Sequence, residues 1–185
     1  RTHPERGGVA AYEERFRFVF DLSNGQSIEY RGQASAEVVE SQLMDKGALE
    51  KRLRDAVKGL KDIGVASDDR GVTITLENIQ FEPDSARLLP SELDKIRRIA
   101  EVLKAEPDRH LLISGHTAMA GTAEGRLQLS QERARAVAEA LISMGVRVPE
   151  DITVIGYGAE RPVADNLTEL GRSRNRRVEI TILEN

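Results

Sequence analysis

Residues 111–134 read LLISGHTAMAGTAEGRLQLSQERA, and this stretch carries the pattern that decides the fold. Its first three residues form a short apolar run that predicts a buried strand. The run leads into Gly115-His116-Thr117, and a loop over about 118–125 follows. A helix with apolar residues at 129, 137, 140 and 141 then continues to Gly145. The stretch therefore predicts a strand, a loop and a helix in direct succession.

The alternation of strand and helix extends to both sides of this stretch. An apolar run of period two predicts a strand over 72–81, and a helix begins after a capping-box-like Ser91 and ends at Pro107. Further strands are predicted over 152–155 and 178–182, with at most one short helix in the polar stretch between them. The order β-α-β-α-β-(α)-β predicts an α+β fold of two layers, with a mixed sheet of about four strands and helices on one face.

The first 70 residues follow a different pattern. Residues 1–11 form a polar tail, and Phe16, Phe18 and Phe20 then recur at every second position, as in a strand with one apolar face. Asn24-Gly25 separates this run from a second strand-like run, which predicts a β-hairpin. An isolated hairpin is only marginally stable in water, so we expect its apolar face to pack on the helices that follow or on a further domain.

A helical segment is expected between the hairpin and the alternating part of the chain. Apolar residues at 49, 53, 57 and 60 recur every three or four positions, which predicts helix over 34–63 with an interruption near Gly47. The polar cluster at 67–71 predicts a turn and a domain boundary. We therefore expect residues 1–70 to hold the tail, the hairpin and the helical segment, and residues 71–185 to form a domain that folds by itself.

The composition argues against several classes of function. The 185 residues include no Cys, which excludes disulfides, thiol nucleophiles, iron–sulfur clusters and Cys-based zinc sites. The net charge of −4 argues against a general nucleic-acid binder. No apolar run approaches the ~18 residues of a membrane span. The sequence starts at Arg1 without a signal-peptide-like segment, so we expect targeting information to have been removed.

The sequence also lacks the common catalytic and metal-binding patterns. The three His, at positions 3, 110 and 116, share no metal-ligand spacing with Asp or Glu. No Ser lies in a Gly-x-Ser-x-Gly elbow, and no Gly-Lys-Ser/Thr phosphate loop occurs. We therefore predict no metal ion, no cofactor and no enzymatic activity, and we expect His116 to make a structural hydrogen bond at the base of its loop.

Four motif blocks occur in an order and spacing typical of one family. They are Gly115-His116-Thr117, Leu-Ser-Gln-Glu-Arg-Ala at 129–134, Gly156-Tyr157-Gly158, and Gly-Arg-Ser-Arg-Asn-Arg-Arg-Val-Glu-Ile at 171–180. The strand end at Phe81 and the following Ser85-Ala86 fit the same pattern. Residues 72–183 thus resemble the OmpA-like C-terminal domain family, whose members associate with peptidoglycan, and residues 1–70 take no part in the resemblance.

The resemblance implies a periplasmic, non-enzymatic module, tethered to or associated with the outer membrane, that binds the diamino acid of the peptidoglycan stem peptide. In the family, an Asp directly after Gly-His-Thr binds the ligand ammonium, and the Arg of Leu-Ser-x-x-Arg-Ala binds its carboxylate. A zwitterionic ligand needs an anion and a forked cation that face each other. By resemblance, the pocket residues here are Thr117, Ala118, Arg126, Arg133, Asn175 and Arg176.

This chain departs from the family pattern at two of those positions. Ala118 stands where the pattern has Asp, and Arg126 stands where it has Asn, whereas Arg133 is kept. Glu124 and Glu132 are the acids that could compensate. The departures predict that peptidoglycan binding is weak or lost, through a degenerate pocket. The alternative is a structural or protein–protein interaction scaffold in the periplasm, with envelope proteins as its partners.

The arginines leave two interpretations open. Arg133 either binds an anionic group or forms a salt bridge on the helix surface. The cluster of Arg172, Arg174, Arg176 and Arg177 either attracts an anionic glycan or lipid headgroup or forms a solvated, salt-bridged face. For Arg177 we expect a structural role.

Overall fold

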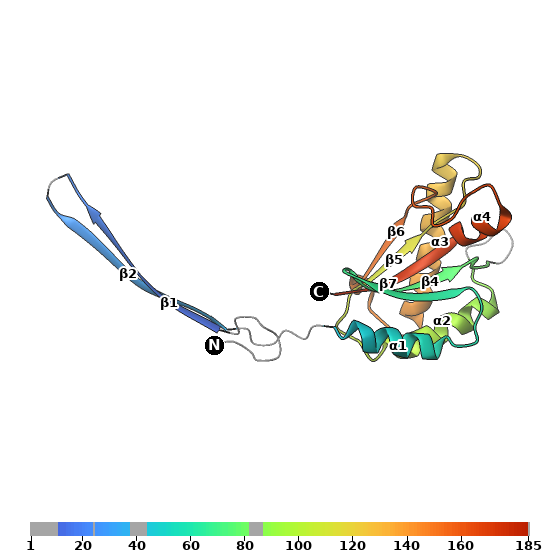
Figure 1. Ribbon diagram of the computed structural model, residues 1–185, viewed down its shortest axis with the longest axis horizontal. Coiled ribbons are helices and arrows are strands. Elements are labelled where there is room, and N and C mark those ends of the chain that lie inside the picture. Colours follow the sequence, from blue (N-terminus) through green and yellow to red (C-terminus); the bar gives the residue numbers. More distant parts are fainter. Residues whose placement is uncertain (1–10, 24, 38–43, 82–86, 185) are drawn as a thin grey trace. The chain divides into compact units, whose positions relative to one another are not determined.

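The computed structural model describes residues 11–23, 25–37, 44–81 and 87–184 (Figure 1). The chain forms two compact units, Arg1–Gln42 and Leu43–Asn185, and each is described by itself. Within the described residues, no helix has the length and apolar character that crossing a membrane requires.

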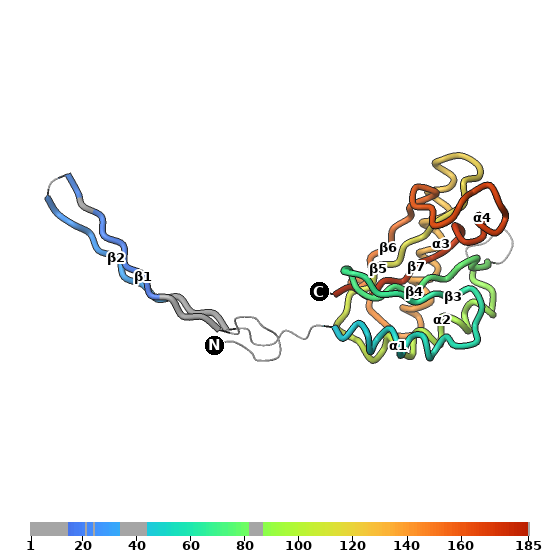
Figure 2. The backbone as a smooth tube through the Cα atoms, in the orientation of Figure 1, coloured from blue at the N-terminus to red at the C-terminus, as the bar shows by residue number. Residues whose placement is uncertain are grey.

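The larger unit is built on a mixed sheet of five strands in the order β3-β4-β7-β5-β6 (Figure 2). The strands are β3 (Ile63–Asp68), β4 (Gly71–Glu77), β5 (Leu111–Gly115), β6 (Ile152–Gly156) and β7 (Arg177–Leu183). β5 and β6 are parallel, and the other neighbours are antiparallel. The last strand of the chain therefore lies in the middle of the sheet.

Three helices cover one face of this sheet (Figure 1). They are α1 (Lys46–Ala56), α2 (Pro90–Leu103) and α3 (Ala123–Ser143), while the short α4 (Glu169–Asn175) leads into β7. A one-turn 3₁₀ helix, Pro149–Asp151, precedes β6. This arrangement confirms the predicted two-layer α+β fold with helices on one face.

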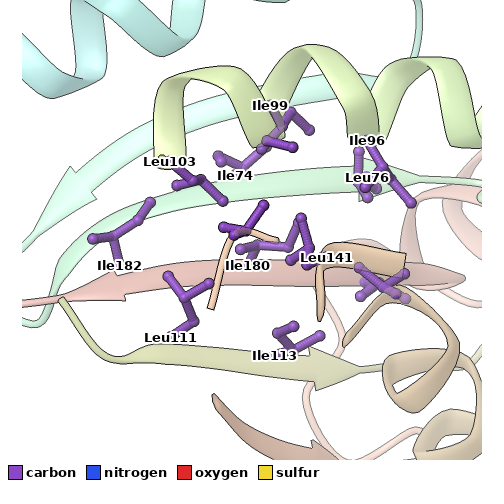
Figure 3. Close-up of a cluster of buried hydrophobic side chains, with 14 of the residues drawn as sticks. Ile74, Leu76, Ile96, Ile99, Leu103, Leu111, Ile113, Leu141, Ile180 and Ile182 are labelled. Carbon is purple, nitrogen blue, oxygen red and sulfur yellow. The ribbon is translucent and has the colours of Figure 1, made fainter. Parts of the chain in front are cut away.

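The core lies between the helices and alternate residues of the central strands (Figure 3). Ile180 of β7 pairs with Ile74 on one side and with Ile113 on the other, so three buried side chains line up across the sheet. On the opposite face, the hydroxyl groups of Thr73 and Thr181 hydrogen-bond at 2.9 Å. The period-two pattern of these strands thus separates an apolar from a polar face.

The segment predicted as helix over 34–63 is divided among three elements. Residues 34–37 belong to β2 (Ser27–Glu37), and α1 covers only 46–56. Residues 63–68 form β3, which makes a sheet of five strands where about four were predicted. Residues 38–43 lie outside those described. Asp45 begins α1 by accepting a hydrogen bond from the amide of Ala48. In β3 only Val65 is buried, so this edge strand shows no alternation by which it could be found in the sequence.

The units also divide at a different point from the boundary expected at Gly71. The larger unit begins at Leu43, because α1 and β3 pack into its core. Leu49 and Leu53 of α1 are fully buried there, and β3 pairs with β4 along six residues. That residues 71–185 can fold without these elements stays a prediction.

The smaller unit contains the predicted hairpin, formed by β1 (Ala11–Asp21) and β2 (Ser27–Glu37). Gly25 has φ 81°, a conformation that the turn requires and that glycine adopts without strain. Within this unit Phe16, Phe18 and Phe20 are 41%, 55% and 54% exposed, and their cover by another element or molecule stays a prediction.

Candidate functional site

The end of β5 lies directly against helix α3, and two glycines allow this close approach. A Cβ atom on Gly115 would lie 1.9 Å from the carbonyl oxygen of Ser130, and one on Gly156 would lie 2.6 Å from the amide nitrogen of Gln131. The Ser130 hydroxyl accepts a hydrogen bond from the amide of Gly158 at 2.9 Å. The carbonyl of Gly158 accepts one from the amide of Thr117 at 2.8 Å. Three of the four motif blocks thus meet at one place.

Arg133 follows Ser130 by three residues on α3, so its side chain projects from the same side of the helix, about one turn further on. Its guanidinium carbon lies 5.4 Å from the centre of the Phe81 ring. Its Nε is buried without a hydrogen-bond partner among the described residues, and no described acid forms an ion pair with it. Burial, together with the nearby charge of Arg176, lowers the pKa of Arg133. Within the part of the chain that the structure describes, the site therefore holds a partly buried cation without a paired acid.

Thr117 and Ala118 form the floor of the loop that leaves β5. Both are buried, at 6% and 5% exposure, and the Thr117 hydroxyl has no partner among the described residues. The carbonyl of Ala118 accepts a hydrogen bond from the amide of Ala120, and the amide of Met119 donates to Asn166 Oδ1 at 3.0 Å. The position after Gly-His-Thr thus presents a buried methyl group and no charge.

Arg126 lies in the first turns of α3 and supports the loop before it. Its Nη1 donates to the carbonyl of Gly121 at 2.6 Å, and the helix itself is capped by the hydroxyl of Thr122. The acids considered as compensation lie nearby in sequence. Glu132 accepts a hydrogen bond from Gln128 on its own helix, and Glu124 is exposed. Among the described residues, neither acid forms an ion pair with Arg133.

Asn175, at the end of α4, holds the neighbouring loop in place. It is fully buried, and its Oδ1 accepts hydrogen bonds from the amides of Val163 and Ala164 at 2.9 and 3.0 Å. Its Nδ2 donates to the carbonyl of Ala164 and to Asn166 Oδ1. Because Asn166 also binds the amide of Met119, this network joins the loop after β5 to the loop before α4.

One acid, Glu169, pairs with two arginines of the cluster at α4. Glu169 pairs with Arg176 at 2.5 Å and with Arg172 at 2.9 Å. The hydrogen bonds from Arg176 and then Arg172 lower the pKa of Glu169. Arg174 is exposed and lies 3.7 Å from Glu77. The predicted salt-bridged face therefore describes Arg172, Arg174 and Arg176 well.

The sequence analysis did not predict a cluster of Glu179, His116 and Arg177 that lies next to the site. Burial alone would raise the pKa of Glu179, but His116 and Arg177 outweigh it and lower that pKa to about 2. Arg177 Nε donates to Glu179 at 2.8 Å, and His116 Nε2 lies 3.7 Å from the same carboxylate. Among the described residues, neither ring nitrogen of His116 has a hydrogen-bond partner, so the expected structural hydrogen bond of this side chain is not found there; instead, the ring stacks on Tyr157. Residues 177 and 179 are two positions apart in β7 and so lie on one face of the strand, and this spacing could have predicted their ion pair.

The structure thus brings Thr117, Ala118, Arg133, Asn175 and Arg176 into one region, with Arg126 beside it in the first turns of α3. Within the described residues, no group of three or more His, Asp or Glu could hold a metal ion. Among the described acids of this region, Glu169 is engaged by Arg172 and Arg176 and Glu179 by Arg177, and none of them pairs with Arg133. The arrangement can bind an anionic group, and it offers little to a cation.

Comparison with known proteins places this geometry in context. Residues 80–176 match the OmpA family. The peptidoglycan-binding protein ArfA of Mycobacterium tuberculosis is 39% identical over 104 residues, which are 56% of this chain and 32% of ArfA. This chain therefore spans about a third of the length of that relative.

Two further matches come from Pseudomonas aeruginosa. The peptidoglycan-associated lipoprotein of this organism is 35% identical over 117 residues, which are 63% of this chain and 68% of the lipoprotein. The solved structure of the cell wall anchor of its T6SS has a TM-score of 0.62 and 29% identity, and the match covers 74% of this chain and 97% of the anchor.

Proposed function

The chain belongs to the OmpA family, and from this premise we propose that it is a non-enzymatic domain of the cell envelope that associates with peptidoglycan through a degenerate pocket. The names of its relatives support peptidoglycan as the partner, since they include a peptidoglycan-binding protein and a peptidoglycan-associated lipoprotein. A periplasmic location, in association with the outer membrane, follows from the same proposal.

One observation carries the proposal for the ligand. The half-buried Arg133 has a buried, unpartnered Nε and pairs with no described acid. An unpaired buried charge is unfavourable, so a ligand carboxylate that pairs with it gains a strong, charge-assisted hydrogen bond. We therefore propose that Arg133 binds the carboxylate of the diamino acid in the stem peptide.

The other half of such a ligand has no partner in this pocket. Ala118 presents a methyl group where a carboxylate would be needed for the ligand ammonium, and the charges of Arg133 and Arg176 repel a cation. A missing charge-assisted hydrogen bond costs about 1.5–3 kcal/mol. This corresponds to roughly a ten- to hundredfold loss of affinity, so we propose weak binding.

A second candidate is a scaffold that binds another envelope protein at the same end of the fold. Met119, Leu167 and Leu170 are 55%, 90% and 76% exposed, and Met119 is tied to the segment of Leu167 through Asn166. Exposed apolar side chains of this kind mark protein contacts. In this case the pocket itself contributes no binding.

Sedimentation with purified sacculi distinguishes the two candidates. The unaltered chain should bind weakly, and Arg133→Ala should abolish that binding because the carboxylate loses its partner. Arg135→Ala is the matched control, since Arg135 is exposed on the same helix. Binding that is insensitive to Arg133→Ala, or no binding at any concentration, would favour the scaffold.

A further inference from the structure

The hairpin of the smaller unit has one continuous apolar face. The register pairs Phe16 with Gly32, Phe18 with Tyr30, and Phe20 with Ile28, so these residues share one side of the two-stranded sheet. Three of the four Phe residues of the chain lie here. The side chains of Phe18, Phe20 and Tyr30 are all more than half exposed, at 54–57%.

The face is ordered by contacts among its own rings. The Phe16 ring lies over Gly32, where a Cβ atom would come within 2.2 Å of it, so the ring occupies the space that a side chain would fill. Phe16 and Phe18 lie 5.6 Å apart, and Phe20 meets Tyr30 edge to face at 5.9 Å. The face therefore presents a fixed relief.

The two ends of the face differ in shape. One end carries the Phe16–Phe18 ring pair, and the other has a shallow apolar depression lined by Phe20, Leu22, Ile28 and Tyr30. A two-fold rotation between two copies can place the ring pair of each over the depression of the other, and a symmetric dimer is formed by one such patch that contacts its own copy.

Charged side chains on the opposite face of the hairpin pair with one another. Glu29 pairs with Arg17 and with Arg31, both at 2.5 Å, on the side that faces away from the rings. An antiparallel sheet with one polar and one apolar face normally covers the apolar one, and two strands alone are marginally stable in water. The aromatic face is therefore the one that needs a covering partner.

We propose that the aromatic face of the hairpin is covered by the same face of a second copy of this chain. Four half-exposed aromatic rings with Leu22 and Ile28 offer roughly 500 Å² per hairpin. A face-to-face pair then buries roughly 1,000 Å² in total, which reaches the lower range of specific interfaces.

The charges of the hairpin favour a second copy over a lipid surface. Residues 11–37 contain three Arg and five acidic residues, a net charge of −2, whereas adsorption to an anionic bilayer needs basic residues around the apolar face. From 16 to 22 and from 28 to 32, the residues on the aromatic side are all uncharged. Two such faces meet without like charges in contact.

Pairing also has a consequence for the wall-binding site. A dimer carries two Arg133 pockets on one particle. Two linked weak sites bind a polymer more tightly than either does alone, without any new contact in the pocket. The dimer is an inference independent of the pocket, since it rests on the hairpin alone.

The absence of Cys allows a direct test on the full chain. Phe18→Cys, on the aromatic face, should form a covalent dimer with a short bismaleimide linker at about 1 mM chain, a concentration chosen to exceed the dissociation constant that loss of the Phe18 ring raises, whereas Arg17→Cys, on the polar face of the same strand, should not. Equal cross-linking of both variants, or of neither, would overturn the proposal. Because each variant changes one residue of an otherwise intact hairpin, the comparison does not depend on unfolding it.

Sedimentation equilibrium then measures the strength of the pair. The unaltered chain should show a reversible dimer within about 1–100 µM, and Phe18→Ser should raise its dissociation constant at least about tenfold, with Arg17→Ser unchanged. A chain that stays monomeric throughout, or a dimer insensitive to Phe18→Ser, contradicts the proposal. Flotation of the monomer with anionic vesicles would assign the face to lipid instead.

Discussion

Strands β1 and β4 carry the same alternation of apolar residues, yet their apolar faces have different surroundings. Val72, Ile74 and Leu76 of β4 are 0–1% exposed beneath a layer of helices, whereas Phe16 and Phe18 of β1 are 41% and 55% exposed. Period two determines that a strand has one apolar face. It does not determine what covers that face, because the cover comes from elements elsewhere in the chain or from another molecule.

The largest effect is expected when part of the cover of β4 is removed. Residues 71–185 lack α1 and β3, and with them the buried Leu49, Leu53 and Val65. Each such side chain contributes about 1.5–3 kcal/mol, so the loss is several kcal/mol, a large part of a typical domain's stability. We predict that 71–185 unfolds cooperatively but at a urea midpoint well below that of 43–185. Equal midpoints would show that α1 and β3 add nothing to the core.

A matched pair of single substitutions sharpens the same contrast. Ile180→Ala leaves a cavity in the middle of the sheet and should reduce the free energy of unfolding of the larger unit by about 2–5 kcal/mol. Phe18→Ala, in the exposed face, should change that unfolding transition by less than about 0.5 kcal/mol. Thermal unfolding followed by circular dichroism measures both. A similar loss for the two variants would mean that the hairpin is part of the same cooperative unit.

Charged side chains also differ in whether the fold supplies them with a partner of opposite charge. Arg133 pairs with no described acid and Ala118 carries no charge, so Ala118→Asp should supply the missing half of a zwitterion site and strengthen binding of a diamino-acid stem peptide about ten- to hundredfold. Arg126→Asn should add to that gain, and Arg133→Ala in the same background should remove it. Calorimetry with the stem peptide is the measurement. If Ala118→Asp has no effect, position 118 does not face the ligand.

Glu179, in contrast, is a buried charge with its partners in place. Its pKa is lowered from 4.5 to about 2 in the folded state, so its stabilisation is present above about pH 4.5 and is lost as the pH falls toward 2. After screening by solvent, Glu179→Gln should cost about 1–2 kcal/mol at neutral pH and flatten the acid side of the stability profile. Urea unfolding between pH 7 and 3 tests this, and an unchanged slope below pH 4.5 would contradict it.

Much of the candidate site could be predicted because its residues lie in contiguous motifs. Gly115-His116-Thr117 and the block 129–134 are each read along the chain, so their residue types are visible without a fold. The His116–Glu179 contact was not predictable, since it joins residues 63 positions apart across the pairing of β5 with β7. The network of Asn175 with Val163, Ala164 and Asn166 was equally hidden, because a buried amide shows no pattern in sequence.

The sequence by itself determined the period of each strand and helix, the hairpin turn at Gly25 and the family of the larger unit. These depend on local sterics and on side-chain spacing, which neighbouring residues specify. Tertiary structure alone decided that α1 and β3 join the core, that Arg133 is half-buried without a described acid to pair with, and that Glu179 is held charged. Each of these depends on which distant groups exclude water from a side chain, and burial of that kind is a property of the assembled fold.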